Sequence, residues 1–232
     1  MRKETIRISG RRCWIYATEL SEYLLIKPDF TYDAKVLEKE VDTILSSTCR
    51  PFTYVAFEVL DWQNELPPWP APAVFGNTPF GDGAGSTLSF VKDMLVPEVQ
   101  KMLSNGNVAM KCLLGGYSLG GLFALWCCHQ TRMFHGIAAV SPSVWYPGWL
   151  DYAEREVPLA THVYLSLGDK EEKTKNPVMA RVGDCIRRQH QLLAAQGVST
   201  ILEWNKGNHF QDFEERTAKG FAWLMNTLNE KT

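Results

Sequence analysis

The sequence predicts an α/β fold in which a mainly parallel sheet is covered by helices on both faces. Short apolar segments rich in β-branched and aromatic residues alternate with helical patterns along the chain, and this alternation is typical of parallel strand–helix units. One α/β domain can span 232 residues without dividing, so we expect a single domain over residues 1–232. Proline and glycine cluster in one segment, which predicts one long loop within that domain.

Three short strands are predicted near the amino terminus, over Thr5–Ile8, Cys13–Ala17 and Tyr23–Lys27. Only brief turns separate them, so we expect them to be antiparallel. An amphipathic helix is predicted next, over Asp33–Ser46. Antiparallel strands are therefore expected to precede the parallel part of the sheet.

The segment Phe52–Leu60 is rich in aromatic and branched residues and predicts a strand buried on both faces. A long loop is expected after it, because residues 62–87 contain a cluster of Pro and Gly that no regular element tolerates. The loop carries four large aromatic residues, Trp62, Trp69, Phe75 and Phe80. Disordered linkers are poor in aromatic residues, so we expect this loop to be packed.

The rest of the chain alternates strands with helices. Strands are predicted over Val108–Gly115, Gly136–Val140, His162–Leu167 and Thr200–Trp204. Helices are predicted over Ser89–Leu103, Gly120–His129, Gly148–Glu156, Val178–Gln196 and Phe213–Leu228. The carboxyl ends of parallel strands meet at one edge of a sheet, so the residues that follow these strands are candidates for a common site.

Charge and hydropathy argue against nucleic-acid and membrane partners. The net charge of −2 and the isoelectric point near 6.2 leave no basic excess for a phosphate backbone. The amino terminus carries charges where a secretory signal has its apolar region, and no segment approaches the roughly 18 apolar residues of a membrane span. We expect a soluble, cytoplasmic protein.

The cysteines and histidines indicate neither a disulfide framework nor a metal site. The six cysteines lack CxxC spacing and most lie within apolar segments, which favours reduced, buried thiols. The five histidines are scattered without HxH or HxxxH spacing, so no set of metal ligands is predicted. The sequence implies no metal and no cofactor.

A candidate nucleophile lies in the segment Gly116–Gly120, which matches the G-x-S-x-G pattern with Ser118 at its centre. An apolar strand precedes the pattern and a helix follows it, as a nucleophile elbow requires. Glycines two positions either side of the serine leave room for a tight turn, and the Leu119 N–H can then meet a developing oxyanion. The alternative is that the glycines only allow close strand–helix packing and that Ser118 caps the helix.

His209 is the candidate general base, because it lies between the last predicted strand and the last predicted helix. That position places it on the edge of the sheet that carries the serine. Each of the other histidines flanks a helix end, opens a strand or lies among charged helix residues. A structural role is the simpler interpretation of those four.

Three segments, GGYSLGGLFALW, AAVSPSVWY and NHFQDF, together resemble an esterase family of the α/β-hydrolase superfamily. This family includes esterase D-like enzymes, siderophore esterases and mycolyltransferases. The resemblance extends from about Phe52 to the carboxyl terminus. It implies an α/β-hydrolase fold, with Ser118 as the nucleophile and His209 as the base.

In this class the acid follows a strand, and the segment after His162–Leu167 offers Asp169, Glu171 and Glu172. The class commonly places the acid three residues after the glycine that ends the strand, which is Glu171 counted from Gly168. The alternative is that these carboxylates belong to a solvated loop, as at least two of the three must. Some family members act with a serine–histidine pair alone.

The second oxyanion donor is expected from the loop after Phe52–Leu60, and we assign it to the N–H of Trp62. No HGGG motif is present, so a loop geometry different from that of the lipases must supply this donor. Three aromatic residues, Tyr117, Trp145 and Trp69, are candidates for substrate binding, and Ser143 and Tyr146 are candidates for lining the same pocket. Ordinary aromatic core and loop packing is an equally good interpretation of each.

The residues together predict a serine hydrolase that cleaves a small-molecule ester through an acyl-enzyme on Ser118. Few residues separate Trp145 from the strand at His162, so we expect no large lid, a shallow pocket, and short or soluble acyl esters as substrates. Acyl transfer to another acceptor, or amide hydrolysis, fits the same residues. A binding protein that keeps the fold without catalysis is the alternative from another class, although nucleophile, acid and base occur in the expected chain order.

Overall fold

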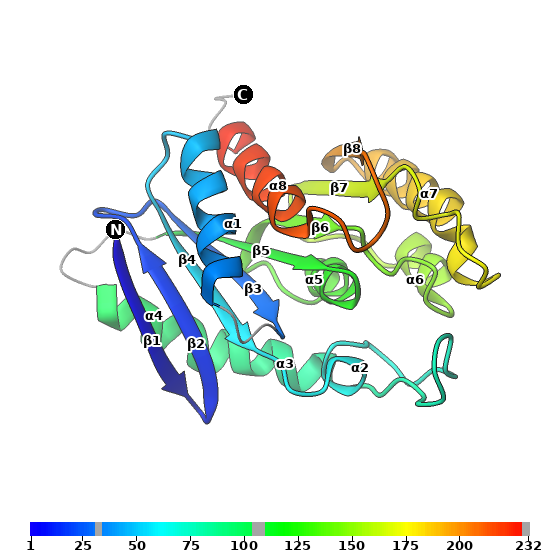
Figure 1. Cartoon of the computed structure of the whole chain (residues 1–232), viewed down its shortest axis with the longest axis horizontal. Coiled ribbons are helices and arrows are strands. Elements are labelled where there is room, and N and C mark those ends of the chain that lie inside the picture. The colour runs from blue at the N-terminus through cyan, green and yellow to red at the C-terminus, as the bar shows by residue number, and fades with distance from the viewer. Residues whose placement is uncertain (31–33, 104–109, 229–232) are drawn as a thin grey trace.

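The computed structural model describes residues 1–30, 34–103 and 110–228. Its centre is an eight-stranded sheet with the order β1-β2-β4-β3-β5-β6-β7-β8 (Figure 1). The pair β1 (Arg2–Ile8) and β2 (Arg11–Ala17) is antiparallel, and so is the pair formed by β2 and β4 (Phe52–Glu58). The other strand pairs of the sheet are parallel, which confirms the predicted fold class.

The strand β3 (Tyr23–Asp29) belongs to the parallel part of the sheet. It runs opposite to β2, as expected, but β4 lies between them, and β3 pairs in parallel with β4 and with β5 (Lys111–Tyr117). The brief connection from β2 passes the amino end of β4, where the Thr18 N–H donates to the Phe52 carbonyl oxygen at 3.0 Å. The prediction of a third antiparallel strand was therefore wrong in its pairing, because a short connection decides direction but not neighbour.

The remaining elements follow the predicted strand–helix alternation. The further strands are β6 (Phe134–Val140), β7 (His162–Gly168) and β8 (Ser199–Asn205). The helices are α1 (Ala34–Ser47), α2 (Trp62–Glu65), α3 (Ala84–Phe90), the π-helical η1 (Val91–Leu95), α4 (Val96–Leu103), α5 (Leu119–Gln130), α6 (Trp149–Arg155), the 3-10 turn η2 (Met179–Arg181), α7 (Val182–Ala195) and α8 (Phe213–Thr227). The first residue of the predicted helix Asp33–Ser46 and the first residue of the predicted strand Val108–Gly115 lie outside the described residues.

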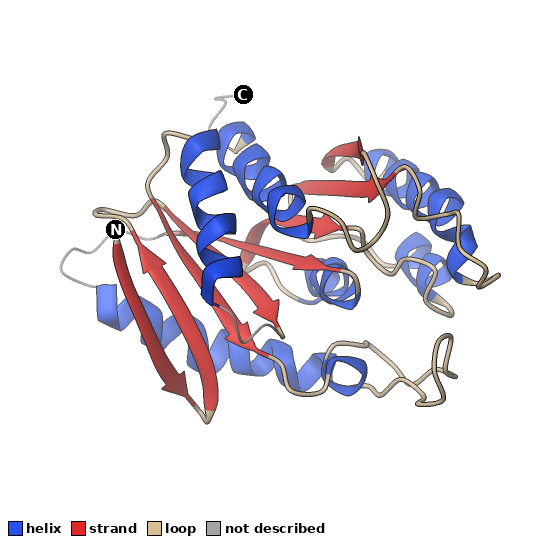
Figure 2. Ribbon diagram, viewed as in Figure 1, coloured by secondary structure: helices blue, strands red, loops and turns tan. Residues whose placement is uncertain are grey.

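Helices cover both faces of the sheet, as the sequence predicted (Figure 2). On one face α1 and α8 lie side by side and form one apolar core with the strands beneath them. On the other face α3 to α7 contribute to a larger core. The helix α5 is apolar on all sides because it is buried within this larger core, which explains the run of small and apolar residues after Ser118.

The segment rich in Pro and Gly has helical turns at both ends, so the prediction that it holds no regular element was wrong there. The helix α2 begins at Trp62 because the Asp61 carboxylate caps it and accepts the Asn64 N–H at 3.1 Å. The helix α3 begins at Ala84, five residues before the predicted start at Ser89. Local capping and the helix that follows outweigh the low helix propensity of this composition.

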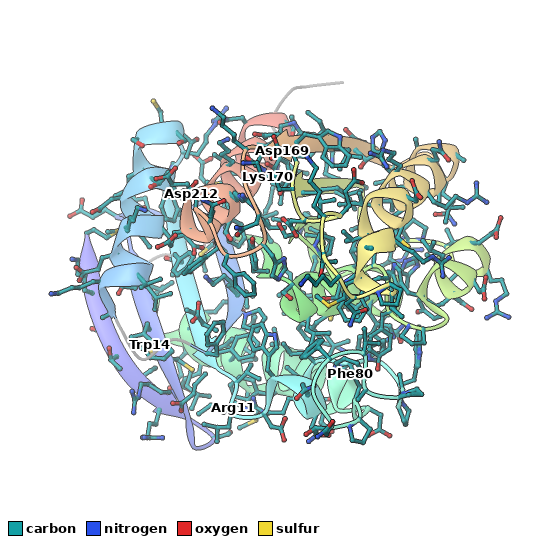
Figure 3. All side chains as sticks on the ribbon, turned by 45° about the vertical axis from the view of Figure 1, so that its right-hand side comes forward. Arg11, Trp14, Phe80, Asp169, Lys170 and Asp212 are labelled. Carbon is teal, nitrogen blue, oxygen red and sulfur yellow. The ribbon has the colours of Figure 1, made fainter. Side chains whose placement is uncertain are left out.

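The middle of that segment is packed, as its aromatic content predicted. Phe80, which is labelled in Figure 3, is buried. Its ring lies 5.2 Å from that of Tyr146 and 6.3 Å from that of Trp145. The ring of Phe75 contacts both Phe80 and Trp145. These contacts fix the loop against the segment that follows β6, close to the edge where the candidate residues gather.

The six cysteines are free thiols, and five are buried as predicted, whereas Cys49 is exposed. Burial raises the pKa of the Cys112 thiol to about 11 and that of Cys13 to about 12, so both stay protonated and unreactive near neutral pH. None of the described helices has both the length and the apolar composition needed to cross a membrane.

Candidate active site

Ser118 lies in the tight turn between β5 and α5, where its backbone adopts φ +59° and ψ −120°. Non-glycine residues rarely adopt a positive φ, so the surrounding structure must hold this conformation in place. The Ser118 N–H donates to the Val140 carbonyl oxygen at 3.1 Å. A side chain at Gly116 would collide with the Gly120 backbone, which explains why the turn needs glycine there.

The hydroxyl of Ser118 faces the imidazole of His209. The distance from Ser118 Oγ to His209 Nε2 is 3.1 Å, and His209 Nδ1 lies 2.7 Å from Glu171 Oε2. The three residues follow β5, β8 and β7 respectively, so three separate strands bring them to one edge of the sheet. In this arrangement Nε2 can accept the serine proton while the carboxylate orients the ring, and we call it the Ser–His–Glu chain.

Of the three candidate carboxylates, Glu171 is the one that contacts the His209 ring. Asp169 Oδ1 accepts the Gly207 N–H at 2.8 Å and so ties the segment after β7 to the His209 loop. Glu172 lies on the surface, where it pairs with Arg187 at 3.7 Å. Figure 3 shows Asp169 in this segment and Asp212 on the loop that leads into α8.

The Glu171 carboxylate is buried, with 3% of its side chain exposed, and it is fully hydrogen-bonded. Besides His209, it accepts the Ser141 hydroxyl at 2.6 Å and the Gly168 N–H at 2.7 Å, both on Oε1. Burial acts to raise the pKa of Glu171, but the hydrogen bonds from His209, Ser141 and Gly168 outweigh it and hold the pKa below its usual value. The carboxylate is therefore ionised at neutral pH.

Arg216 on α8 is the second charged group beside Glu171, and 2% of its side chain is exposed. Its Nη1 lies 3.1 Å from Glu171 Oε1 and 3.4 Å from the Tyr117 hydroxyl oxygen. Its Nη2 donates to the Lys206 carbonyl oxygen at 2.9 Å. The Tyr117 hydroxyl in turn donates to the His209 carbonyl oxygen at 2.8 Å. One guanidinium thus joins Glu171 to the loop that carries His209.

The sequence analysis did not find Arg216, although a signal exists. Arg216 lies three residues after Phe213 and four before Gly220, on the stripe of α8 that faces the sheet. An arginine on an otherwise apolar helix face needs a buried anionic partner. Ser141 was missed as well, and its positive φ of +45° marks a further strained serine, at the carboxyl end of β6.

Several solved structures similar to this chain are named as esterases or siderophore hydrolases. The siderophore hydrolase EstA from Aspergillus nidulans superposes with a TM-score of 0.74 and 17% identity over 97% of this chain and 94% of its own. The siderophore hydrolase EstB from the same organism superposes with a TM-score of 0.72 and 17% identity, over 100% of this chain and 97% of its own. The enterobactin esterase FES from Shigella flexneri was solved in the presence of enterobactin. It superposes with a TM-score of 0.71 and 19% identity, over 98% of this chain and 60% of its own.

This chain has the α/β-hydrolase fold. At these identities the structural likeness establishes the fold and leaves the activity to be argued from the residues. A scan of protein-family models gave no match, and a search of curated proteins gave none either. In the α/β-hydrolase fold the turn that carries Ser118 is the position of the nucleophile elbow.

The two assigned oxyanion donors, the N–H groups of Leu119 and Trp62, are at the first residues of α5 and α2. Helix-starting N–H groups have no intrahelical acceptor, and neither of these two donates to another backbone or side-chain group among the described residues. The Trp62 ring also lies at the elbow, since a Cβ on Gly120 would be 3.3 Å from it. The position of both residues is compatible with the predicted role, which stays a prediction.

The three residues assigned to substrate binding have different surroundings. Tyr117 lies beneath the His209 loop, where its hydroxyl is engaged with the His209 carbonyl, and burial followed by the charge of Glu171 raises its pKa to about 12. Trp145 lines a groove of about 260 Å³ between the segment after β6 and the start of α7. Trp69 donates its ring N–H to the Pro147 carbonyl oxygen at 2.9 Å and stacks within an aromatic cluster. The substrate-binding role of Tyr117, Trp145 and Trp69 stays a prediction.

Ser143, which the sequence analysis placed among the residues that could line a substrate pocket, has its hydroxyl next to that of Ser118. Its Oγ lies 3.4 Å from Ser118 Oγ, and its N–H donates to the Ser118 carbonyl oxygen at 3.1 Å. The side chain is almost fully buried. Ser143 therefore helps to hold the strained turn from the side of β6.

Proposed function

We propose that this chain is a serine esterase that hydrolyses carboxylic esters through an acyl-enzyme on Ser118. The observation that carries the proposal is the Ser–His–Glu chain at the carboxyl edge of an α/β-hydrolase sheet. The names of the structural neighbours, which include siderophore hydrolases, an enterobactin esterase and a ferulic acid esterase, support an ester as the substrate. A small-molecule ester in the cytoplasm is the partner that we propose.

In the first half-reaction, Ser118 Oγ attacks the ester carbonyl carbon while His209 Nε2 takes the hydroxyl proton. The carbonyl oxygen becomes an oxyanion, which the N–H groups of Leu119 and Trp62 receive. As the carbon–oxygen bond of the ester breaks, His209 returns the proton to the departing alcohol. The acyl group is then bonded to Ser118, and the imidazole is neutral again.

In the second half-reaction, a water molecule attacks the acyl-enzyme and His209 Nε2 takes its proton. The tetrahedral intermediate collapses, the proton passes to Ser118 Oγ, and the carboxylic acid leaves. Glu171 is ionised throughout, and it stabilises the imidazolium in both halves and keeps Nε2 aimed at the serine. The two half-reactions thus need only the side chains of Ser118, His209 and Glu171, the two backbone N–H donors and one water molecule.

The test is labelling by a fluorophosphonate together with turnover of p-nitrophenyl acetate. We expect Ser118→Ala to lose the label and His209→Ala to lose turnover. Ser89→Ala and His135→Ala, which change exposed residues, serve as matched controls with wild-type values. Thermal melting establishes that each variant is folded.

The same assay distinguishes the esterase from a binding protein with the same fold. If the folded wild type neither takes the label nor turns over an ester, the proposal is wrong and the scaffold binds without catalysis. If the label attaches but the acetyl group is transferred mainly to an added alcohol or amine instead of to water, the enzyme is an acyltransferase. Retention of the label in Ser118→Ala would assign the nucleophile elsewhere.

A further inference from the structure

Strongly exposed apolar side chains gather at the edge of the sheet that carries Ser118. Five large apolar residues of the described chain are at least 64% exposed, namely Leu20, Phe30, Leu60, Val157 and Phe210. Three of them follow the carboxyl ends of β3, β4 and β8, whereas Leu20 and Val157 precede β3 and β7 at the opposite edge. Exposed apolar side chains are therefore present at the edge where a substrate would dock.

Phe210 is the most exposed of these side chains, at 85%, and it is joined directly to His209. The centroids of the two rings are 5.4 Å apart and their planes are perpendicular. Isolated exposed apolar residues are common on protein surfaces, so exposure alone does not argue for binding. The position of Phe210 next to the base does.

The backbone around Phe210 is held on both sides of the residue. Its own N–H donates to Asn208 Oδ1 at 2.9 Å, and the Asn208 N–H donates to Gln211 Oε1 at 2.8 Å. The carbonyl of His209 is bound by the Tyr117 hydroxyl. The loop therefore presents the aromatic ring beside the imidazole from a fixed backbone, which lowers the entropy lost when a ligand covers the ring.

The chemistry of the proposed reaction tells which part of an ester meets Phe210. His209 Nε2 must reach the oxygen of the departing alcohol to protonate it, so the alcohol group lies on the His209 side of Ser118. The Trp62 ring lies at the elbow near Gly120, and the Phe30 ring packs on Trp62 at 5.3 Å. These two rings are on the side of the predicted oxyanion donors, so Phe210 is the exposed aromatic residue that borders the base.

We propose that Phe210 binds the alcohol portion of the ester, and that the enzyme prefers esters of bulky apolar alcohols or phenols. The inference rests on the proposed esterase function and assigns its leaving-group specificity. Contact between the exposed ring and an apolar leaving group removes area from water on both partners, and we expect about a tenfold effect on kcat/KM.

This assignment has a kinetic consequence that separates the two half-reactions. The alcohol has departed before the acyl-enzyme reacts with water, so Phe210 contacts the substrate only during acylation. Replacing Phe210 therefore slows acylation by esters of bulky alcohols. It leaves the hydrolysis of the acetyl-enzyme unchanged.

The experiment compares wild type with Phe210→Ala on two series of esters. Methyl, cyclohexyl and 2-naphthyl acetate vary the alcohol, and methyl acetate, butyrate and benzoate vary the acyl group. The ratio of wild-type to variant kcat/KM cancels the intrinsic reactivity of each ester. We expect a ratio near one for methyl acetate that rises to about ten for 2-naphthyl acetate, and no trend along the acyl series.

Two further variants sharpen the result. Leu20→Ala removes an equally exposed side chain at the opposite edge of the sheet and should give a ratio near one for every ester. Phe210→Leu keeps an apolar side chain and should recover most of the preference. Equal losses for all alcohols, a loss that follows the acyl group, or slower decay of the acetyl-enzyme would each overturn the assignment.

The outcome is separable from that of the proposed function. If the wild type takes the fluorophosphonate label and hydrolyses methyl acetate but the Phe210→Ala ratios are flat, the leaving-group assignment alone is wrong. If the wild type neither labels nor hydrolyses any ester, the esterase proposal fails and the assignment falls with it.

Discussion

Arg216 and Glu171 form a buried ion pair directly behind the His209 ring, with 3.1 Å between Nη1 and Oε1. The two side chains come from α8 and from the segment after β7, so the pair joins the last helix to the parallel sheet. Burying two charges is costly, and such a pair persists where geometry and further hydrogen bonds compensate. Here the guanidinium also supports Tyr117 and the His209 loop, so it positions both Glu171 and His209.

Replacing Arg216 with methionine should lower both stability and activity. Glu171 would be left as a buried carboxylate with fewer partners, so we expect the free energy of unfolding to fall by about 3 to 5 kcal/mol. Urea denaturation measures this change. Lys219→Gln on the same helix, which breaks the exposed pair with Glu203, should cost less than about 1 kcal/mol and serves as the control.

The kinetic readout distinguishes positioning from general destabilisation. At a temperature where all variants are folded, Arg216→Met should lower kcat for methyl acetate while KM stays close to the wild-type value, because the base loop is displaced and the exposed binding surface is not. Arg216→Lys keeps the charge and should recover part of kcat. A wild-type kcat in folded Arg216→Met would show that the guanidinium is structural only.

Replacing Glu171 with glutamine should lower kcat by about 100- to 10,000-fold, because an amide neither stabilises the imidazolium nor enforces the required tautomer. Glu172→Gln changes the adjacent carboxylate, which faces the surface, and should leave kcat within about twofold of wild type. Steady-state rates on p-nitrophenyl acetate are sufficient for this comparison. Similar losses in the two variants, or a loss confined to Glu172→Gln, would contradict the geometry.

The lowered pKa of Glu171 predicts how stability depends on pH. A carboxyl group whose pKa is depressed in the folded state contributes stability above its usual pKa, near 4.5, and that contribution is lost as the pH falls through the folded value. The difference in unfolding free energy between wild type and Glu171→Gln should therefore shrink as the pH falls below 4.5. Urea titrations at each pH measure it. A difference that grows as the pH falls would mean that the folded pKa is raised.

Each part of the site that the sequence predicted lies just after a predicted strand, where a local pattern marks it. The elbow at Ser118 needs one strand, one turn and one helix in succession, so the spacing of its glycines was a sufficient signal. Arg216 depends on contacts with Glu171 and Tyr117, which are 45 and 99 residues away along the chain. The apolar face of α8 can indicate that Arg216 needs a buried anion, but it cannot indicate which residue supplies it. The neighbours of β3 could not be predicted from its short connection to β2 either, because β4, which comes later in the chain, lies between the two strands.

Aromatic residues illustrate a second limit of reading function from sequence. Trp69 and Phe210 are both large aromatic residues in loops at the carboxyl edge of the sheet, yet Trp69 is stacked among other rings and Phe210 is exposed. Burial is decided by segments that arrive from elsewhere in the chain, here the residues after β6 that cover Trp69. Composition gives the candidates, and packing decides which of them a substrate can touch.

Two glycines that differ in their surroundings, Gly116 and Gly85, allow the strain at the Ser118 turn to be tested. In Gly116→Ala the new methyl group would meet the Gly120 backbone, which cannot move without breaking the first turn of α5, so we expect a loss of at least about 3 kcal/mol in unfolding free energy. In Gly85→Ala the methyl group meets nothing within 4 Å on a helix, so we expect a gain of about 0.5 to 1 kcal/mol. Urea denaturation measures both changes, and fluorophosphonate labelling reports the turn itself. If Gly116→Ala kept wild-type stability and labelling, the turn would tolerate a side chain at position 116, and the expected collision with the Gly120 backbone would be wrong.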